Sequence, residues 1–159
     1  MKILGFVLYF LGGLGLLILA IVMTGAPLRI YWDPFSLVLL LGLQIFASAS
    51  FSGLLGFVKA FSDPFNKQAE AKDLRRAHSF WKGQTPLSFI AAFVGLLQGG
   101  IAIVQNLSDP NAVLKGVALA FLMLGYALVL NLLLFYPYRL LCEKRLTEDK
   151  DPVSYFFGS

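Results

Sequence analysis

Residues Gln84–Arg145 decide the fold of this chain, and they read QTPLSFIAAFVGLLQGGIAIVQNLSDPNAVLKGVALAFLMLGYALVLNLLLFYPYRLLCEKR. Two apolar runs, at about 86–106 and 111–141, flank the short polar turn 107–110. About 20 apolar residues in a helix are enough to cross the hydrocarbon core of a bilayer. The stretch therefore predicts a transmembrane helical hairpin, in which each run crosses the membrane once.

Both runs carry small residues at helical spacing. The first run has them at Ser88, Ala92, Gly95, Gly99 and Ala102. The second run has them at Gly116, Ala120 and Ala127, interrupted by Met123. Such stripes let helix backbones approach one another closely inside a membrane. Two interpretations are open: a seam between helices of the same chain, or a lining that faces a guest helix or a pore.

The composition of the chain indicates a membrane protein. Of the 159 residues, 58% are hydrophobic, and the mean hydropathy is +0.75. Two further apolar runs, at about 3–23 and 34–61, precede a short polar segment at 62–85. Long apolar runs of this kind are typical of integral membrane proteins. We therefore predict an all-α, polytopic membrane protein, with residues 1–159 forming a single bundle of four transmembrane helices that ends in a tail at 146–159.

The basic residues predict how the bundle is oriented. Eleven of the 13 Lys and Arg residues lie before the first run, in or beside segment 62–85, or after the last run. Only Arg29 and Lys115 lie near the other two turns. Lys and Arg concentrate in cytoplasmic loops, so we expect both termini and segment 62–85 to be cytoplasmic. Because these basic residues lie beside membrane spans, the predicted contact is the lipid bilayer and not nucleic acid.

Segment 62–85 is expected to form a short helix on the membrane surface that ends at Gly83. Its apolar positions form one loose face, at Phe65, Ala69, Leu74, Ala77 and Trp81. Its other face is basic, with Lys72, Arg75, Arg76 and His78. These cations favour contact with lipid phosphates or a protein partner, and a solvated, lipid-facing basic surface is the alternative interpretation.

Asp-Pro pairs predict where helices begin. They occur at 33–34, 63–64 and 109–110. An Asp side chain can cap the free N–H groups of a helix start, and Pro is tolerated in the first turn. We expect a helix to start at each pair.

Ionisable side chains are missing from the deep parts of the four runs. Asn131 and Gln98 are the deepest strongly polar residues, and we expect both to hydrogen-bond between helices. Proton relays usually need an ionisable group within the membrane, so the chain alone is not a carboxylate-based proton carrier. With only Cys142 and His78 as soft ligands, and with no nucleophile–base pair, we expect no enzyme activity, no cofactor and no metal.

Several segments occur in an order and spacing that match one known family. Near the start they are GGLGLLILAIVMTG (12–25) and DPFSLVLLLGLQIF (33–46). Later they are AAFVGLLQGG (91–100), NLSDPNAVLKGVALAFL (106–122) and YALVLNLLLFYP (126–137). Together these segments resemble the four spans of the A subunit of flagellar-motor stators, the MotA/PomA family within the wider MotA/TolQ/ExbB proton channel group.

The resemblance implies a function and partners. In that family five A subunits surround two copies of a single-span B subunit, and each B helix supplies an ion-binding Asp. The chain would then form a homo-oligomeric wall, a pentamer by the resemblance, around a MotB/ExbD-like partner in the bacterial inner (cytoplasmic) membrane. The implied lining of the pathway or partner helix is Ala91, Ala92, Gly95, Met123, Tyr126 and Ala127. The implied helix-shaping positions are Pro86 and Pro137.

The chain departs from the family in two ways. About 24 residues, at 62–85, stand where stator A subunits carry a large cytoplasmic domain. The hydroxyls of sodium-type members fall on Ala92 and on Met123 and Leu124, which disfavours sodium because hard cations prefer oxygen ligands. We therefore expect a minimal, proton-driven A-type subunit. The alternative is a non-conducting membrane scaffold or assembly subunit with the same fold.

Overall fold

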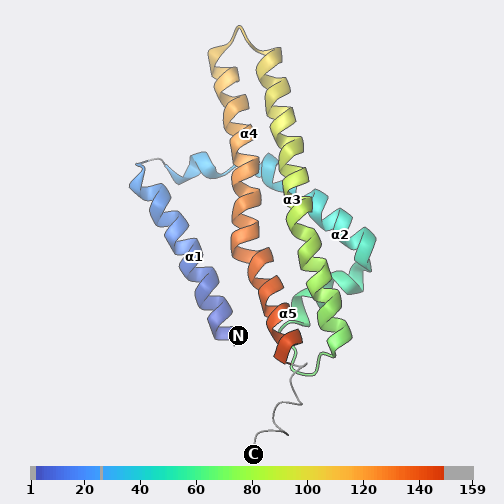
Figure 1. Ribbon diagram of the computed structural model, residues 1–159. Coiled ribbons are helices and arrows are strands. Elements are labelled where there is room, and N and C mark those ends of the chain that lie inside the picture. The colour runs from blue at the N-terminus through green and yellow to red at the C-terminus, as the bar shows by residue number, and fades with distance from the viewer. Residues whose placement is uncertain (1–2, 26, 149–159) are drawn as a thin grey trace, which may run out of the picture.

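The computed structural model describes residues 3–25 and 27–148, and this part of the chain is helical without a strand (Figure 1). The helices are α1 (Ile3–Met23), η1 (Leu28–Tyr31), α2 (Pro34–Ser62), α3 (Ala71–Gln105), α4 (Pro110–Leu130), η2 (Asn131–Phe135) and α5 (Tyr136–Glu148). Four helical segments are long and apolar enough to cross a membrane, since α4, η2 and α5 form one continuous run. The predicted all-α fold with four membrane-spanning helices is confirmed. The predicted tail lies outside the described residues from 149 onward.

Two of the three Asp-Pro pairs open helices as predicted. The Asp33 carboxylate accepts a hydrogen bond from Ser36 N at 3.0 Å, and Asp109 accepts one from Asn111 N at 3.0 Å. The prediction for the third pair was wrong. Asp63 ends α2, where its backbone N–H donates to the carbonyl of Lys59, and α3 begins only at Ala71. The same dipeptide is thus found at either end of a helix, because the neighbouring packing decides where the chain turns.

The prediction that a short surface helix ends at Gly83 was also wrong. Helix α3 runs without interruption from Ala71 to Gln105, through Gly83 and Pro86. A single buried stripe continues across both residues, at Leu74, Ala77, Trp81, Gln84 and Ser88. Its alternating steps of three and four keep one face of the helix against its neighbours. That unbroken packing outweighs the hydrogen bond lost at proline, which costs about 3 kcal/mol in a helix interior.

Helices α3 and α4 form the long central hairpin, and their shared turn lies at the opposite end of the molecule from the described end of α5 (Figure 1). Near α5 an aromatic cluster joins three helices. The Trp81 ring stacks on Tyr138 with centroids 4.3 Å apart, and Phe61 meets Trp81 edge-on at 4.8 Å. The Trp81 Nε1–H donates to the carbonyl of Ala60 at 2.9 Å. The buried indole is thereby satisfied, and α2, α3 and α5 are held together at this end.

Arg145 on α5 closes the same end of the molecule. Its Nη1 donates to the backbone carbonyls of Asp63, Pro64 and Asn66, at 3.1, 3.3 and 2.7 Å. These carbonyls belong to the turn between α2 and α3. A guanidinium presents several N–H donors in a fixed plane, which suits a turn with several free carbonyl groups. The last described helix is therefore tied to the connection that precedes the central hairpin.

Helix α1 stands to one side of the hairpin (Figure 1), and none of its most apolar 18-residue window is buried within the chain. Three residues hold it. The Phe6 ring lies edge-on to Tyr138 at 4.8 Å, and the Tyr9 hydroxyl donates to the carbonyl of Leu132 at 2.9 Å. Gly13 lies against the side chain of Leu133. Most of the apolar surface of α1 is consequently open to lipid or to another protein chain.

Helix α2 changes direction at Gly53. This residue has φ 69° and ψ 158°, outside the helical region, although the helix continues on both sides. Only glycine adopts such a positive φ without a steric penalty from a Cβ atom. Figure 1 shows the first part of α2 leading away from the hairpin and the second part returning toward α5.

Candidate functional site: the seam between α2, α3 and α4

The structure brings the six predicted lining residues together where α3 faces α4. Ala91, Ala92 and Gly95 are buried on α3, and Met123 and Ala127 are buried on α4. Leu40 of α2, which is fully buried, packs into the same cluster, and half-buried Tyr126 covers its side. The seam is a contact within one chain.

Two glycines set how closely the seam packs. A Cβ atom at Gly95 would collide with the side chain of Met123, so methionine fills the space that this glycine leaves. A Cβ atom at Gly99 would lie 2.7 Å from the carbonyl oxygen of Gly116 and 2.8 Å from Ala120 Cβ. The small-residue stripes therefore form a helix–helix seam inside the chain. A lining that faces a second chain stays a prediction, and these side chains offer it almost no surface.

Tyr126 has a contact that the sequence did not indicate. Its hydroxyl donates a short hydrogen bond to the carbonyl of Tyr31 and accepts one from Asp33 N at 2.8 Å. It thus fixes the turn between η1 and α2 onto the middle of the central hairpin. No local pattern links these residues, because the contact depends on how α4 is rotated against the turn.

The two prolines predicted to shape helices lie in different surroundings. Pro86 is exposed inside α3, on the side away from the buried stripe. Pro137 is buried at the second residue of α5, directly after η2. The N–H that proline lacks falls where η2 has already changed the hydrogen-bond pattern: Tyr136 N donates to the carbonyl of Asn131, five residues earlier. Pro137 therefore lies at a change of helix geometry.

A layer of uncharged polar side chains lies beside the seam. Gln84 Nε2 donates to Ser48 Oγ at 2.6 Å, which joins α3 to α2. Asn131 Nδ2 donates to Ser88 Oγ at 2.6 Å and to the carbonyl of Ala127 at 2.7 Å. The prediction that Asn131 bonds between helices is confirmed. Gln44 Nε2 is buried without a partner in the same face of α2.

The sequence itself indicates this polar layer. Ser36, Gln44 and Ser48 follow one another on α2 at multiples of four residues, and Gln84 and Ser88 are four apart on α3. Polar residues at that spacing share a helix face. The pattern indicates two facing polar stripes, but it does not give the pairing between them.

Gln98 differs from Asn131. It lies on α3 in the middle of an apolar run, yet its side chain is exposed, and none of the hydrogen bonds in the described part of the chain joins it to another helix. The prediction of an inter-helix bond for Gln98 is therefore wrong within one chain. An amide at this position of a membrane span would be costly without a hydrogen-bonding partner.

The chemistry available in the seam is restricted. Between Gly83 and Ser108, and again between Gly116 and Tyr138, the sequence has no Asp, Glu, Lys, Arg or His. In residues 3–25 and 27–148, no group of three or more His, Cys, Asp and Glu side chains could hold a metal ion. Amides and hydroxyls can donate, accept and hold water, but they do not take up and release a proton near neutral pH. Any proton-binding group must come from outside this seam.

No family model and no curated protein matches the chain. The likeness to stator A subunits thus rests on the sequence segments alone, and a stator-like function is a proposal.

Proposed function

We propose that this chain is the A-type subunit of a stator-like, proton-driven membrane complex in a bacterial inner membrane. Several copies would form a ring around partner helices that carry the ion-binding Asp. The uncharged seam supports these separate roles: the chain would form the wall, and the partner would supply the ionisable group. On this proposal the chain has no enzyme activity.

The exposed amide of Gln98 is the observation that carries the proposal. It shares the outer face of α3 with the exposed side chains of Val94 and Ile101. A polar side chain in hydrocarbon gains by bonding to another helix, with a measured contribution of roughly 0.6–1.7 kcal/mol. This face, rather than the closed seam, is the surface that we assign to a neighbouring subunit or to the partner helix.

A second function is supported by how tightly the seam closes. The Met123 side chain occupies the space at Gly95, and Ala91, Ala92 and Ala127 are almost fully buried around it. An ion path would then have to run between chains. If assembly leaves no such path, the same fold would serve as a non-conducting scaffold or assembly subunit.

The test begins with assembly. The chain is purified with the membrane proteins that accompany it, and Gln98→Leu is compared with Gln105→Leu, which removes an exposed amide at the end of the same helix. We expect Q98L to lose the oligomer or the partner on native gels, while Q105L retains both. Equal retention of oligomer and partner by the two variants would contradict the assignment of this face.

Ion flux then separates the two functions. Reconstituted alone in liposomes, the chain is expected to pass neither protons nor sodium, because a dehydrated ion meets no charged group in the seam. With an Asp-bearing partner, proton flux should appear without sodium, and Asp→Asn in the partner should abolish it. A correctly assembled complex without ion flux would support the function as a scaffold or assembly subunit. Ion flux through the chain alone would refute the proposal that the chain is a wall without an ion-binding group.

A further inference from the structure

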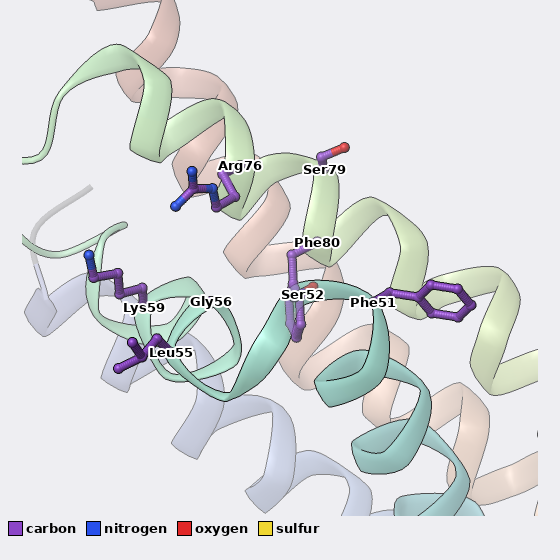
Figure 2. A pocket seen from close by; sticks show the side chains of 8 residues that line it. All are labelled: Phe51, Ser52, Leu55, Gly56, Lys59, Arg76, Ser79 and Phe80. Atoms are coloured by element: carbon purple, nitrogen blue, oxygen red, sulfur yellow. The ribbon is translucent and has the colours of Figure 1, made fainter.

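An open pocket lies between the second part of α2, around and beyond the bend at Gly53, and the first part of α3 (Figure 2). Its volume is about 660 Å³. That is within the usual range for a site that holds a small molecule. Its lining residues are Phe51, Ser52, Leu55, Gly56, Lys59, Arg76, Ser79 and Phe80. Neither the seam nor the outer face of α3 near Gln98 contributes to it.

The two ends of the pocket differ in chemistry. Figure 2 shows the charged ends of Lys59 and Arg76 at one end and the ring of Phe51 at the other. Phe51 is 90% exposed, and Leu55, which lies beside Lys59 in Figure 2, is 79% exposed. Ser52 and Phe80 lie between the two ends. The pocket therefore suits a ligand with an anionic group joined to a long apolar part.

The two cations are available to bind an anion. The ion pairs in the described part of the chain are Lys72–Glu70 and Lys144–Glu148, and neither involves the pocket. Asp63 is a nearby carboxylic acid that interacts electrostatically with both Lys59 and Arg76. The pKa of Asp63 is raised, first by burial and then by Asp73, while Lys59 and Arg76 act to lower it. The acids do not form ion pairs with Lys59 or Arg76.

The pocket is shaped before any ligand arrives. The Phe80 ring that forms its wall packs edge-on against Phe57 at 5.8 Å and against Trp81 at 5.1 Å, so it is anchored to the aromatic cluster. Gly56 has no side chain to fill the space, and the positive φ of Gly53 sets the bend at which the pocket opens. The wall formed by Phe80 is therefore fixed before a ligand binds, which lowers the cost of ordering on that side of the pocket.

The position along the chain favours a lipid. Residues 34–58 contain no charge, and Lys59 is the first charged residue after them. The charged end of the pocket therefore lies where the apolar span of α2 ends, at the depth of lipid headgroups, and the exposed ring of Phe51 lies toward the hydrocarbon. A free anion would leave this apolar wall unused.

We propose that this pocket binds one anionic phospholipid, with its phosphate between Lys59 and Arg76 and an acyl chain that passes Phe80 toward Phe51. The site does not depend on the proposed function, because it uses neither the seam nor a partner. The bound lipid would cover exposed apolar surface on α2 and join the second part of α2 to the start of α3.

Native mass spectrometry of the full chain in detergent tests the proposal. The chain is titrated with phosphatidylglycerol or with phosphatidylcholine of the same acyl chains. The double variant Lys59→Gln/Arg76→Gln is compared with Lys67→Gln/Arg75→Gln, which removes two exposed cations outside the pocket. We expect one tightly bound phosphatidylglycerol, with affinity lowered about thirtyfold in the pocket variant and less than about threefold in the control. Equal losses in both variants, or no preference over phosphatidylcholine, would overturn the site.

A second pair of variants tests the apolar half of the site and leaves both cations in place. Gly56→Leu fills the pocket, whereas Gly42→Leu adds the same side chain on α2 where nothing lies within 4 Å of a Cβ atom. We expect only G56L to lose the bound lipid, with both variants eluting as the parent does on size exclusion. Glycerol phosphate, which has no acyl chain, should not displace the lipid at equal concentration. Displacement by it, or lipid retention in G56L, would show that the apolar wall is not used and would refute a lipid site.

Discussion

At the scale of single residues, the seam has two glycines in one stripe that leave no room for an added methyl group. Gly95 faces Met123, whose Cγ atom and, at 2.8 Å, Cβ atom would collide with an added Cβ atom. Gly99 faces the backbone carbonyl of Gly116 and the Cβ atom of Ala120. A change of methionine rotamer moves Cγ and the atoms beyond it, but it moves neither a Cβ atom nor a backbone carbonyl. An added methyl group should therefore be costly at both positions.

Gly99→Ala is expected to destabilise the protein by roughly 1–3 kcal/mol, because the added methyl group pushes α3 away from α4. Gly95→Ala should cost a similar amount, since the Cβ atom of Met123, 2.8 Å from the added methyl group, cannot withdraw by a change of rotamer. Gly100→Ala, where nothing lies within 4 Å, is the control, and it should be neutral or slightly stabilising. Equilibrium unfolding in mixed micelles measures all three. A seam variant as stable as Gly100→Ala would show that the seam is packed differently.

At the scale of elements, α2 is two helical segments that meet at a bend. The bend is at Gly53, which has φ 69° and ψ 158°, and the pocket between α2 and α3 opens there. This combination of φ and ψ is adopted almost only by glycine, and a residue with a Cβ atom meets a penalty there of roughly 1–3 kcal/mol. The direction of the second part of α2 thus depends on one glycine.

Gly53→Ala should lower the free energy of unfolding by roughly 1–3 kcal/mol or straighten α2, because alanine resists a φ of 69° with a ψ of 158°. Gly42→Ala in the same helix has no such φ and no close neighbour, so it serves as the matched control and should leave stability nearly unchanged. Thermal unfolding followed by circular dichroism reports the first effect. Spin-label distances between the two halves of α2 report the second, and an unaltered stability together with an unaltered distance would argue against the bend.

How far a sequence predicts such elements depends on whether the cause is local. The lengths of the apolar runs and the caps at Asp33 and Asp109 are local, and the predicted helices follow them. The course of α3 through Pro86 is not local, because it depends on the buried face that Trp81 and Ser88 share with other helices. The seam also depends on causes that are not local in the sequence. Its small residues could be recognised, but the hydrogen-bond partners of Tyr126 depend on how α4 is rotated, and residue spacing does not predict that rotation.

At the scale of the whole molecule, the basic residues gather at the end where three parts of the chain meet. The start of α1, the turn between α2 and α3, and the described end of α5 lie at one end of the molecule, and the turn between α3 and α4 lies at the other (Figure 1). The first end has most of the Lys and Arg residues, including Lys67 and Lys144. This distribution favours a cytoplasmic position for that end.

Reporter fusions check this orientation. Fusions within 62–83 and after Thr147 should give a cytoplasmic signal, and a fusion at Ser108, in the turn between α3 and α4, should give the opposite signal. The physical reason is that basic segments beside membrane spans are retained on the cytoplasmic side. A periplasmic signal from either of the first two positions would overturn the orientation, although not the helical fold.

The π-helical turn η2 determines how α5 is rotated about its own axis, and hence which way its side chains point. Each residue advances a helix by about 100°, so the wider turn at Asn131–Phe135 sets the angular phase with which α5 begins. Deleting one residue there would rotate the whole of α5, turning Tyr138 off Trp81 and bringing Cys142 out of the interior. The aromatic cluster therefore depends on the number of residues in η2 as well as on the identity of the aromatic residues.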